Sequence, residues 1–350
     1  MQLPIKSITF WIRLRTIAVA SVLAVGLAVP VAAGPLEDGL AAYNRQDFAT
    51  ALKLWRPLAE KGNAIIQNNL GAMYEHGQGV PQNYAEAVRF YQLAANQGNA
   101  TAQTNLGSMY ANGKGVLVNH VEAVRLYRLA ADQKNSTALY NLGHMYLDGK
   151  GVPPSRAEAV RLIRLAAEQG FATAQNYLAF MILLTPPPNY AEAARWYRLA
   201  ADQGHARSQF ELGLMYERGQ GVPQSYVEAV RWYRVAAIQG LAPAQHNLGN
   251  IYVKGLGVPQ NNAEALRLYR LAAEQGFVGS QFNLGLMYEK GQGVPRDYVL
   301  AHMWLNIAAA RATSAEHRDI AAKDRDLIAS NMTPAQIAQA QKLAAEWKPK

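Results

Sequence analysis

The sequence predicts an all-α protein, an α/α solenoid built from stacked antiparallel helix pairs. Half of the residues are hydrophobic and only 17% are charged, which argues against a disordered chain. A Leu-Gly step recurs with a spacing of 36 residues, except for one interval of 70 residues that contains a shortened copy at Leu178-Ala179. The glycines of this step are Gly71, Gly107, Gly143, Gly213, Gly249 and Gly285. Seven copies of one unit favour a stacked array over a single globular core.

The first segment, residues 1–33, has the composition of a cleaved signal peptide. Its only charges are Lys6, Arg13 and Arg15, and an apolar run of 14 residues follows at 16–29. This run is short for a membrane span, and Val31-Ala32-Ala33 supplies small residues for cleavage. We therefore expect an exported protein, periplasmic or secreted, without stable membrane insertion after cleavage. Its net charge falls from +9 to +6 when these three cations are removed.

Residues 34–62 predict a shorter helix pair that caps the N-terminal end of the array. This segment lacks the Gly-x-Gly loop of the later units, and a terminal unit of a solenoid is expected to be atypical. The repeats then occupy residues 63–310.

Each repeat predicts two helices joined by a short loop. In the first copy, Leu70, Met73 and Tyr74 recur at helical spacing between Ala64 and His76. Gly77 follows at the place where a helix needs a left-handed cap, and a second helix is expected from Tyr84 to Gln97. The asparagine that precedes Leu-Gly in most copies is expected to satisfy backbone groups between units, because buried polar groups need partners.

The fourth repeat departs from this pattern. Residues 181–188, Met-Ile-Leu-Leu-Thr-Pro-Pro-Pro, stand where the other copies have the glycine loop. Three prolines cannot continue a helix, so this loop is shorter and stiffer. Two interpretations remain open, namely drift of a tolerant loop and a local change of superhelix curvature.

Residues 311–350 predict C-terminal capping helices that cover the last apolar face. Thr333 is the expected N-cap of the final helix, with Pro334 at its first position.

The repeated pattern A-x-x-x-x-N-L-G-x-M-Y-x-x-G-x-G-V-P, followed by A-E-A-x-R-x-Y-R-L-A-A-x-Q-G, resembles the Sel-one-like repeat (SLR) family, relatives of the tetratricopeptide repeats. The resemblance covers residues 64–310. It implies an α/α solenoid that serves as a scaffold or adaptor in protein complexes. It also implies, for exported bacterial members, roles in exopolysaccharide export, cell-envelope assembly or contact with host proteins.

The same resemblance implies a partner-binding concave groove formed by the first helices. In tetratricopeptide geometry the groove residues lie two before and two, five and six after the leucine of Leu-Gly. Transferred to this sequence, they include Tyr140, His144, Asn176, Phe180, Leu183, Leu184, Phe210, Leu214, Arg218, His246, Asn250, Lys254, Phe282 and Lys290. These positions vary between repeats while the packing positions do not, as a surface shaped for one partner would.

The sequence offers no strong catalytic or cofactor motif. It contains no cysteine, and no pair of its seven histidines has the H-E-x-x-H spacing of a metal site. The Gly-x-Gly runs follow helices instead of strands, so they do not indicate nucleotide binding. We expect no cofactor, no metal and no nucleic-acid partner. The predicted function is a non-enzymatic scaffold with protein partners; the alternatives are binding of an envelope glycan such as peptidoglycan, and a hydrolase whose site is assembled across repeats.

Overall fold

The computed structural model describes residues 34–349, and the predicted signal peptide at residues 1–33 lies outside this range. The described residues form eighteen helices and no strand. The helices follow one another as antiparallel pairs in chain order, so the predicted α/α solenoid is confirmed.

Each of the seven repeats consists of a first helix and a second helix. The first helices are α3 (Ala64–His76), α5 (Ala100–Asn112), α7 (Ser136–Asp148), α9 (Ala172–Leu183), α11 (Ala206–Arg218), α13 (Ala242–Lys254) and α15 (Val278–Lys290). The second helices are α4 (Tyr84–Asn96), α6 (His120–Asp132), α8 (Arg156–Glu168), α10 (Tyr190–Asp202), α12 (Tyr226–Ile238), α14 (Asn262–Glu274) and α16 (Tyr298–Arg311).

The glycine of the Leu-Gly step is the point at which the two helices of a repeat cross closely. A β-carbon on Gly71 would lie 2.5 Å from the ring of Tyr91, which is fully buried in the second helix. Any larger side chain at this position would push the helices apart. The 36-residue period of glycine is therefore a packing requirement within each repeat.

The loop between the two helices depends on a second pair of glycines. Gly77 ends α3 in the left-handed conformation with φ 67°, as the sequence predicts. Gly79 has φ 71°, and a β-carbon there would lie 2.8 Å from Cβ of Phe48 in the preceding pair. The loop of one repeat therefore packs directly on the start of the previous second helix.

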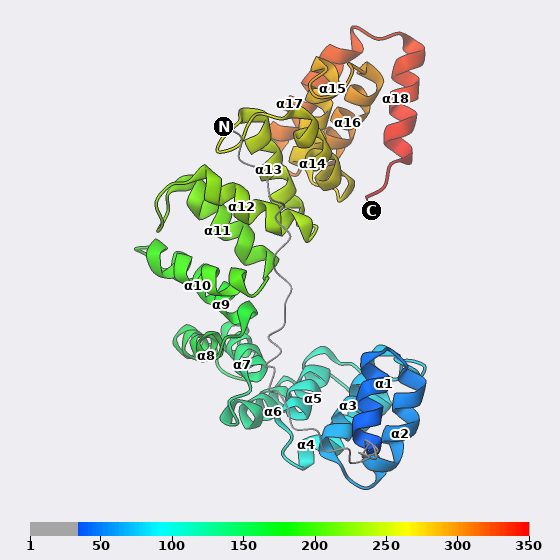
Figure 1. Ribbon diagram of the computed structural model, residues 1–350, viewed down its shortest axis with the longest axis vertical. Coiled ribbons are helices and arrows are strands. Elements are labelled where there is room, and N and C mark those ends of the chain that lie inside the picture. Colours follow the sequence, from blue (N-terminus) through cyan, green and yellow to red (C-terminus); the bar gives the residue numbers. More distant parts are fainter. Residues whose placement is uncertain (1–33, 350) are drawn as a thin grey trace, which may run out of the picture.

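The stack bends into an open arc, with α1 near one end and α18 at the other (Figure 1). Successive first helices are bridged by side chains, as where Asn105 Nδ2 donates to Asn68 Oδ1 at 3.0 Å. The surface formed by the first helices is called here the concave face, after the groove geometry that the sequence resemblance implies.

The fourth repeat ends its first helix differently from the others. Helix α9 stops at Leu183, and its C-cap residue Leu184 keeps a right-handed conformation instead of the left-handed glycine cap. The hydroxyl of Thr185 donates to the carbonyl of Met181 at 3.0 Å and accepts from Arg156 at 3.2 Å. A side-chain hydroxyl thus closes the helix end that glycine closes elsewhere.

Two further helix pairs flank the repeats. Helices α1 (Pro35–Asn44) and α2 (Phe48–Glu60) precede them and bury Trp55. Helices α17 (Ala315–Ala329) and α18 (Pro334–Glu346) follow, and both pack on α16. Thr333 caps α18 in a full capping box with Gln336, which confirms the predicted N-cap. Among the described helices, none combines the length and apolar character that a membrane crossing needs.

Candidate functional site: the concave face and its terminal pocket

Aromatic side chains gather on the concave face where the third and fourth repeats meet. The aromatic cluster, as we call it, consists of Tyr140, His144, Phe171, Tyr177 and Phe180. The ring centroid of Tyr140 lies 4.5 Å from that of His144 and 5.6 Å from that of Phe171. Tyr177 contacts His144 at 4.6 Å and Phe180 at 6.1 Å. Rings from α7 and α9 therefore form one continuous surface.

The histidine in this cluster behaves as an aromatic packing residue. Burial lowers the pKa of His144, and the nearby carboxylate of Asp148 opposes that shift in part. Nε2 of His144 is buried and has no hydrogen-bond partner in residues 34–349. A neutral imidazole that packs edge-on and tilted against two tyrosine rings explains both observations.

The solvent-exposed part of the aromatic cluster lies in the fourth repeat. Phe180 is 47% exposed and Leu184 is 56% exposed, while Leu183 is half-buried. Asn176, predicted as a groove residue, has a structural contact, because its Oδ1 accepts a hydrogen bond from Ser208 Oγ at 2.9 Å. The exposed apolar residues of α9 are therefore available to another molecule, and Asn176 ties α9 to α11.

The predicted groove residues of the fifth repeat are not all accessible. Phe210 is only 8% exposed and packs 5.8 Å from the ring of Tyr233. Leu214 is half-buried, and Arg218 is exposed at the end of α11. The structure therefore places Phe210 in the core and separates it from the aromatic cluster.

A row of cationic side chains runs along the C-terminal half of the solenoid. Arg218, Lys254 and Lys290 are the last residues of α11, α13 and α15, and all three are exposed. None of them forms an ion pair with another residue of the described chain. The corresponding helices of the first three repeats end in His76, Asn112 and Asp148, so this cationic row is confined to the later repeats.

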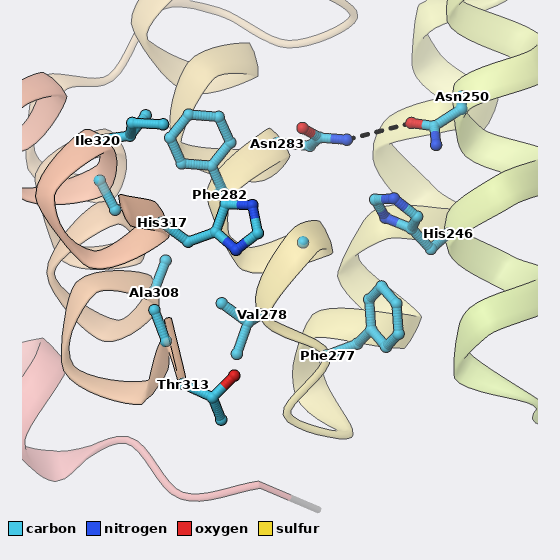
Figure 2. Close-up of a pocket in the computed structure, with 13 residues that line it drawn as sticks. His246, Asn250, Phe277, Val278, Phe282, Asn283, Ala308, Thr313, His317 and Ile320 are labelled. Atoms are coloured by element: carbon cyan, nitrogen blue, oxygen red, sulfur yellow. Dashed lines mark hydrogen bonds between the residues drawn. The ribbon is translucent and has the colours of Figure 1, made fainter. Parts of the chain in front are cut away.

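A pocket of about 610 Å³ opens between α13, α15 and α17 (Figure 2). We call it the terminal pocket. Three of the predicted groove residues, His246, Asn250 and Phe282, line it together. Its remaining lining residues are Phe277, Val278, Gly279, Asn283, Ala308, Ala312, Thr313, His317, Ile320 and Ala321. The C-terminal helix α17 thus forms one wall of a cavity on the repeats.

A hydrogen-bonded set of polar groups lies where α13 meets α15 in the terminal pocket. Nδ1 of His246 lies 2.9 Å from Oγ of the fully buried Ser280. Oδ1 of Asn250 accepts two hydrogen bonds, from the hydroxyl of Tyr269 at 2.6 Å and from Nδ2 of Asn283 at 3.2 Å. Figure 2 shows the Asn283–Asn250 bond above the imidazole of His246. This network fixes the orientation of each side chain.

Burial lowers the pKa of His246 to about 4. The phenyl ring of Phe277 lies 4.9 Å from the imidazole, and that of Tyr269 lies 5.6 Å away. Apolar surroundings disfavour the charged imidazolium, so His246 is neutral near pH 7.

Sequence reasoning missed Phe171, Tyr177 and Phe277. Phe171 and Phe277 occupy the N-cap position that Asn63, Asn99 and Asn135 fill in other repeats, and they make no capping hydrogen bond. The loss of the capping asparagine from a repeating pattern is a signal that could have identified both residues. Each ring instead covers a side chain of the preceding first helix.

A metal centre is not among the features of the described residues, which hold no cluster of three or more histidine or acidic ligands. The described residues of the concave face present aromatic rings, amides and cations.

Comparisons with known proteins agree with the repeat architecture. The Sel1 repeat model matches seven consecutive segments, residues 66–99, 100–135, 136–171, 172–205, 206–241, 242–277 and 278–312. A search of curated proteins gave no match.

Three solved structures are similar to this chain. A Sel1 repeat protein from Oxalobacter formigenes is 28% identical, with a TM-score of 0.60, over 87% of this chain and 97% of that one. A protective antigen of uropathogenic Escherichia coli with an SLR fold is also 28% identical, over 89% of this chain and 83% of that one, with a TM-score of 0.42. An immunity protein from Pseudomonas aeruginosa is 22% identical, over 61% and 81% of the two chains, with a TM-score of 0.37.

Proposed function

The chain belongs to the Sel1 repeat family, and we propose that it is a non-enzymatic scaffold that binds a segment of a partner protein in a groove along its concave face. The observation that carries this proposal is the aromatic cluster with its exposed ring, Phe180. Large rings that contact solvent on an inner surface are the residues from which interface hot spots are commonly built.

The character of the concave face supports a segment with a defined direction. Tyr177, Phe180 and Leu184 provide an apolar contact area in the middle of the solenoid. The cationic row of Arg218, Lys254 and Lys290 follows toward the C-terminus. A partner segment with apolar residues on one part and acidic residues on the next would match this order.

The first test compares capture of a partner by the intact chain and by two double variants. Tyr177→Ala with Phe180→Ala removes rings from the aromatic cluster. Leu117→Ala with Val121→Ala is the matched control, because these side chains are 90% and 68% exposed in a loop and helix start away from the cluster. Circular dichroism establishes that all three proteins are helical.

A partner identified by mass spectrometry is then purified and titrated against each protein. We expect 1:1 binding by the parent and by the Leu117/Val121 variant, and at least about tenfold weaker binding by the Tyr177/Phe180 variant. Equal affinity of the three proteins for the partner would refute the proposal that the partner binds at the aromatic cluster.

The exposed ring of Phe180 also favours one alternative ligand. Sugar rings stack on exposed aromatic side chains, so an envelope glycan is a second candidate for the same surface. Co-sedimentation with purified cell wall that is lost in the Tyr177/Phe180 variant, without capture of any protein, would favour the glycan.

We propose in addition that the protein acts after export, in the periplasm or outside the cell. This rests on the signal-like composition of residues 1–33. N-terminal sequencing of the protein from its native source should begin at or near Gly34; recovery of Met1 from the cytoplasm would contradict export.

A further inference from the structure

At the terminal pocket, the seventh repeat lacks a side chain that the other repeats carry. The second residue of each first helix is, in order, Ile65, Thr101, Thr137, Thr173, Arg207, Pro243 and Gly279. A β-carbon on Gly279 would lie 3.1 Å from Cε1 and 3.5 Å from Nε2 of His246. The open edge of the imidazole therefore faces the space that a side chain would fill.

The polar wall of the pocket leaves three groups without partners. Nε2 of His246, Nδ2 of Asn250 and Oδ1 of Asn283 make no hydrogen bond with the described chain, although the other polar atoms of the same side chains do. Because Oδ1 of Asn250 already accepts two bonds, the adjacent pair of asparagines offers a ligand one amide donor and one amide acceptor. A secondary amide has the complementary acceptor and donor.

The opposite wall is mostly apolar, and Thr313 and His317 are its polar side chains. Val278, Phe282 and Ala308 contribute it together with Ile320 and Ala321 of α17. No lysine, arginine, aspartate or glutamate lines the pocket. His246 is neutral near pH 7 because burial lowers its pKa to about 4. A cationic ligand group would therefore lose its hydration without gaining a counter-ion, and His317 is the one ionisable lining side chain besides His246 that an anionic group could meet.

We propose that the terminal pocket binds an uncharged, apolar residue of a peptide segment, with the adjoining main-chain amide groups hydrogen-bonded to the free Nδ2 of Asn250 and the free Oδ1 of Asn283. The cavity, about 610 Å³, lies within the size range of ordinary ligand pockets and has room for a large side chain with its flanking amides. His246, Asn250 and Phe282 belong to the same repeat positions as the proposed groove, so the pocket continues it. The inference thus rests on the proposed function and specifies the chemistry of one subsite.

The probe is N-acetyl-L-phenylalanine N-methylamide, which contains one apolar side chain between two amides. Binding to the intact chain is followed by saturation-transfer NMR and calorimetric titration. We expect saturable binding with Kd on the order of 1 mM, as for other small fragments. The glycine, aspartate and lysine analogues should bind at least about tenfold more weakly, since each lacks the apolar group or carries a charge.

Two variants locate the binding. Gly279→Thr restores the residue that three other repeats carry at this position, and should weaken probe binding at least about tenfold by filling the pocket. Asn283→Ala removes the free acceptor. The parent should prefer the amide probe to its methyl ester, which keeps the acetamide N–H but lacks the C-terminal N–H, whereas Asn283→Ala should not discriminate between them.

The outcomes separate this subsite from the groove as a whole. The Tyr177/Phe180 double variant should bind the probe as the parent does, because its rings lie in other repeats. Three results would each refute the proposed subsite: no binding of the probe, binding unchanged by Gly279→Thr, or a preference for a charged analogue. None of them would affect partner capture by the aromatic cluster. The opposite result is that Gly279→Thr blocks probe binding while the Tyr177/Phe180 variant binds the partner as tightly as the parent. It would support the subsite in the terminal pocket and refute partner binding by the aromatic cluster.

Discussion

The side-chain amide of Gln97 donates a hydrogen bond to Oε1 of Gln67 at 2.7 Å, and Gln67 is 4% exposed. Nε2 of Gln67 in turn donates to the carbonyl of Ala59, at the end of the preceding second helix, at 2.9 Å. The same arrangement, here called the glutamine ladder, recurs in four later repeats. Its other pairs are Gln103 with Gln133, Gln175 with Gln203, Gln209 with Gln239, and Gln245 with Gln275. Each rung joins three helices.

Removal of one buried glutamine of the glutamine ladder should destabilise the solenoid. Gln209→Ala leaves the carbonyl of Ala201 and the side-chain amide of Gln239 without their partner; the contact to the carbonyl is buried, and the bond to Gln239 is partly buried. We expect a loss of about 1–3 kcal/mol, the usual range for an orphaned buried polar group. The midpoint of urea unfolding, followed by circular dichroism, measures it.

The third repeat supplies the matched control, because it carries Leu139 at the ladder position and buries it. Gln209→Leu should therefore cost less than Gln209→Ala, since a leucine at this position is already compatible with the repeat. An unfolding midpoint of Gln209→Ala equal to that of the parent would show that the ladder contributes nothing to stability.

The sequence predicted the helix pairs and their loops because these follow from strong local signals, the Leu-Gly crossing and the glycine cap. It assigned the wrong residue to the backbone contacts between repeats. The asparagine before Leu-Gly bonds to neighbouring side chains, as Asn247 does to the hydroxyl of Tyr233, whereas buried glutamines reach the carbonyls. In the sequence, a glutamine at a helical position resembles a surface residue, because its burial depends on contacts with the neighbouring repeat.

The concave face was less predictable than the fold. Repeat register identified the helices that carry the aromatic cluster, but it could not distinguish Phe180 from Phe210. Exposure there depends on whether a ring meets a partner in the next helix. Tyr233 covers Phe210, while Phe180 has only the ring of Tyr177 beside it. The terminal pocket also depends on α17, which lies outside the repeat pattern.

The two phenylalanines should respond differently to truncation. Phe210→Ala creates a cavity beside Tyr233 and should cost about 3–5 kcal/mol. Phe180→Ala alters a side chain that is 47% exposed and should cost less than about 1 kcal/mol. Thermal unfolding of both variants under one set of conditions tests this. Similar destabilisation by both would mean that Phe180 is a packing residue and weaken its role in partner binding.

The half-buried His246, whose imidazole packs on the ring of Phe277, should make stability depend on pH. Its folded-state pKa, about 4, lies below the ordinary value of 6.5, because the apolar site disfavours the proton. The unfolded chain binds that proton more readily, so the contribution of His246 is complete above pH 6.5 and is lost as the pH falls toward 4. The full effect is at most about 3 kcal/mol.

His246→Gln removes this titration while keeping a side chain that can bond to Ser280. Between pH 6.5 and 4 the variant should therefore lose less stability than the parent, as measured by urea unfolding at a series of pH values. Carboxylates and the other buried histidines titrate equally in both proteins and cancel in the comparison. Parallel pH profiles would contradict a neutral, buried imidazole.

Two glycines, one in the fifth repeat and one in the sixth, allow the cost of backbone strain to be measured apart from the cost of steric overlap. Gly240 and Gly257 both have positive φ, 87° and 68°, so alanine is strained at either position. A β-carbon on Gly240 meets nothing within 4 Å, whereas one on Gly257 would lie 2.7 Å from the backbone carbon of Tyr226. Gly240→Ala should cost only the conformational penalty, about 1–2 kcal/mol.

Gly257→Ala should cost more, because backbone cannot move aside as a flexible side chain can, and the loop would have to separate from the start of α12. The expected result is a clearly lower thermal midpoint for Gly257→Ala than for Gly240→Ala, with faster amide hydrogen exchange in the loop and the first turn of α12. Equal midpoints would show that the loop does not bear on the preceding helix in solution. Since the same contact recurs at Gly79 against Phe48, a large effect at Gly257 would identify this loop as a general clamp between neighbouring units of the solenoid.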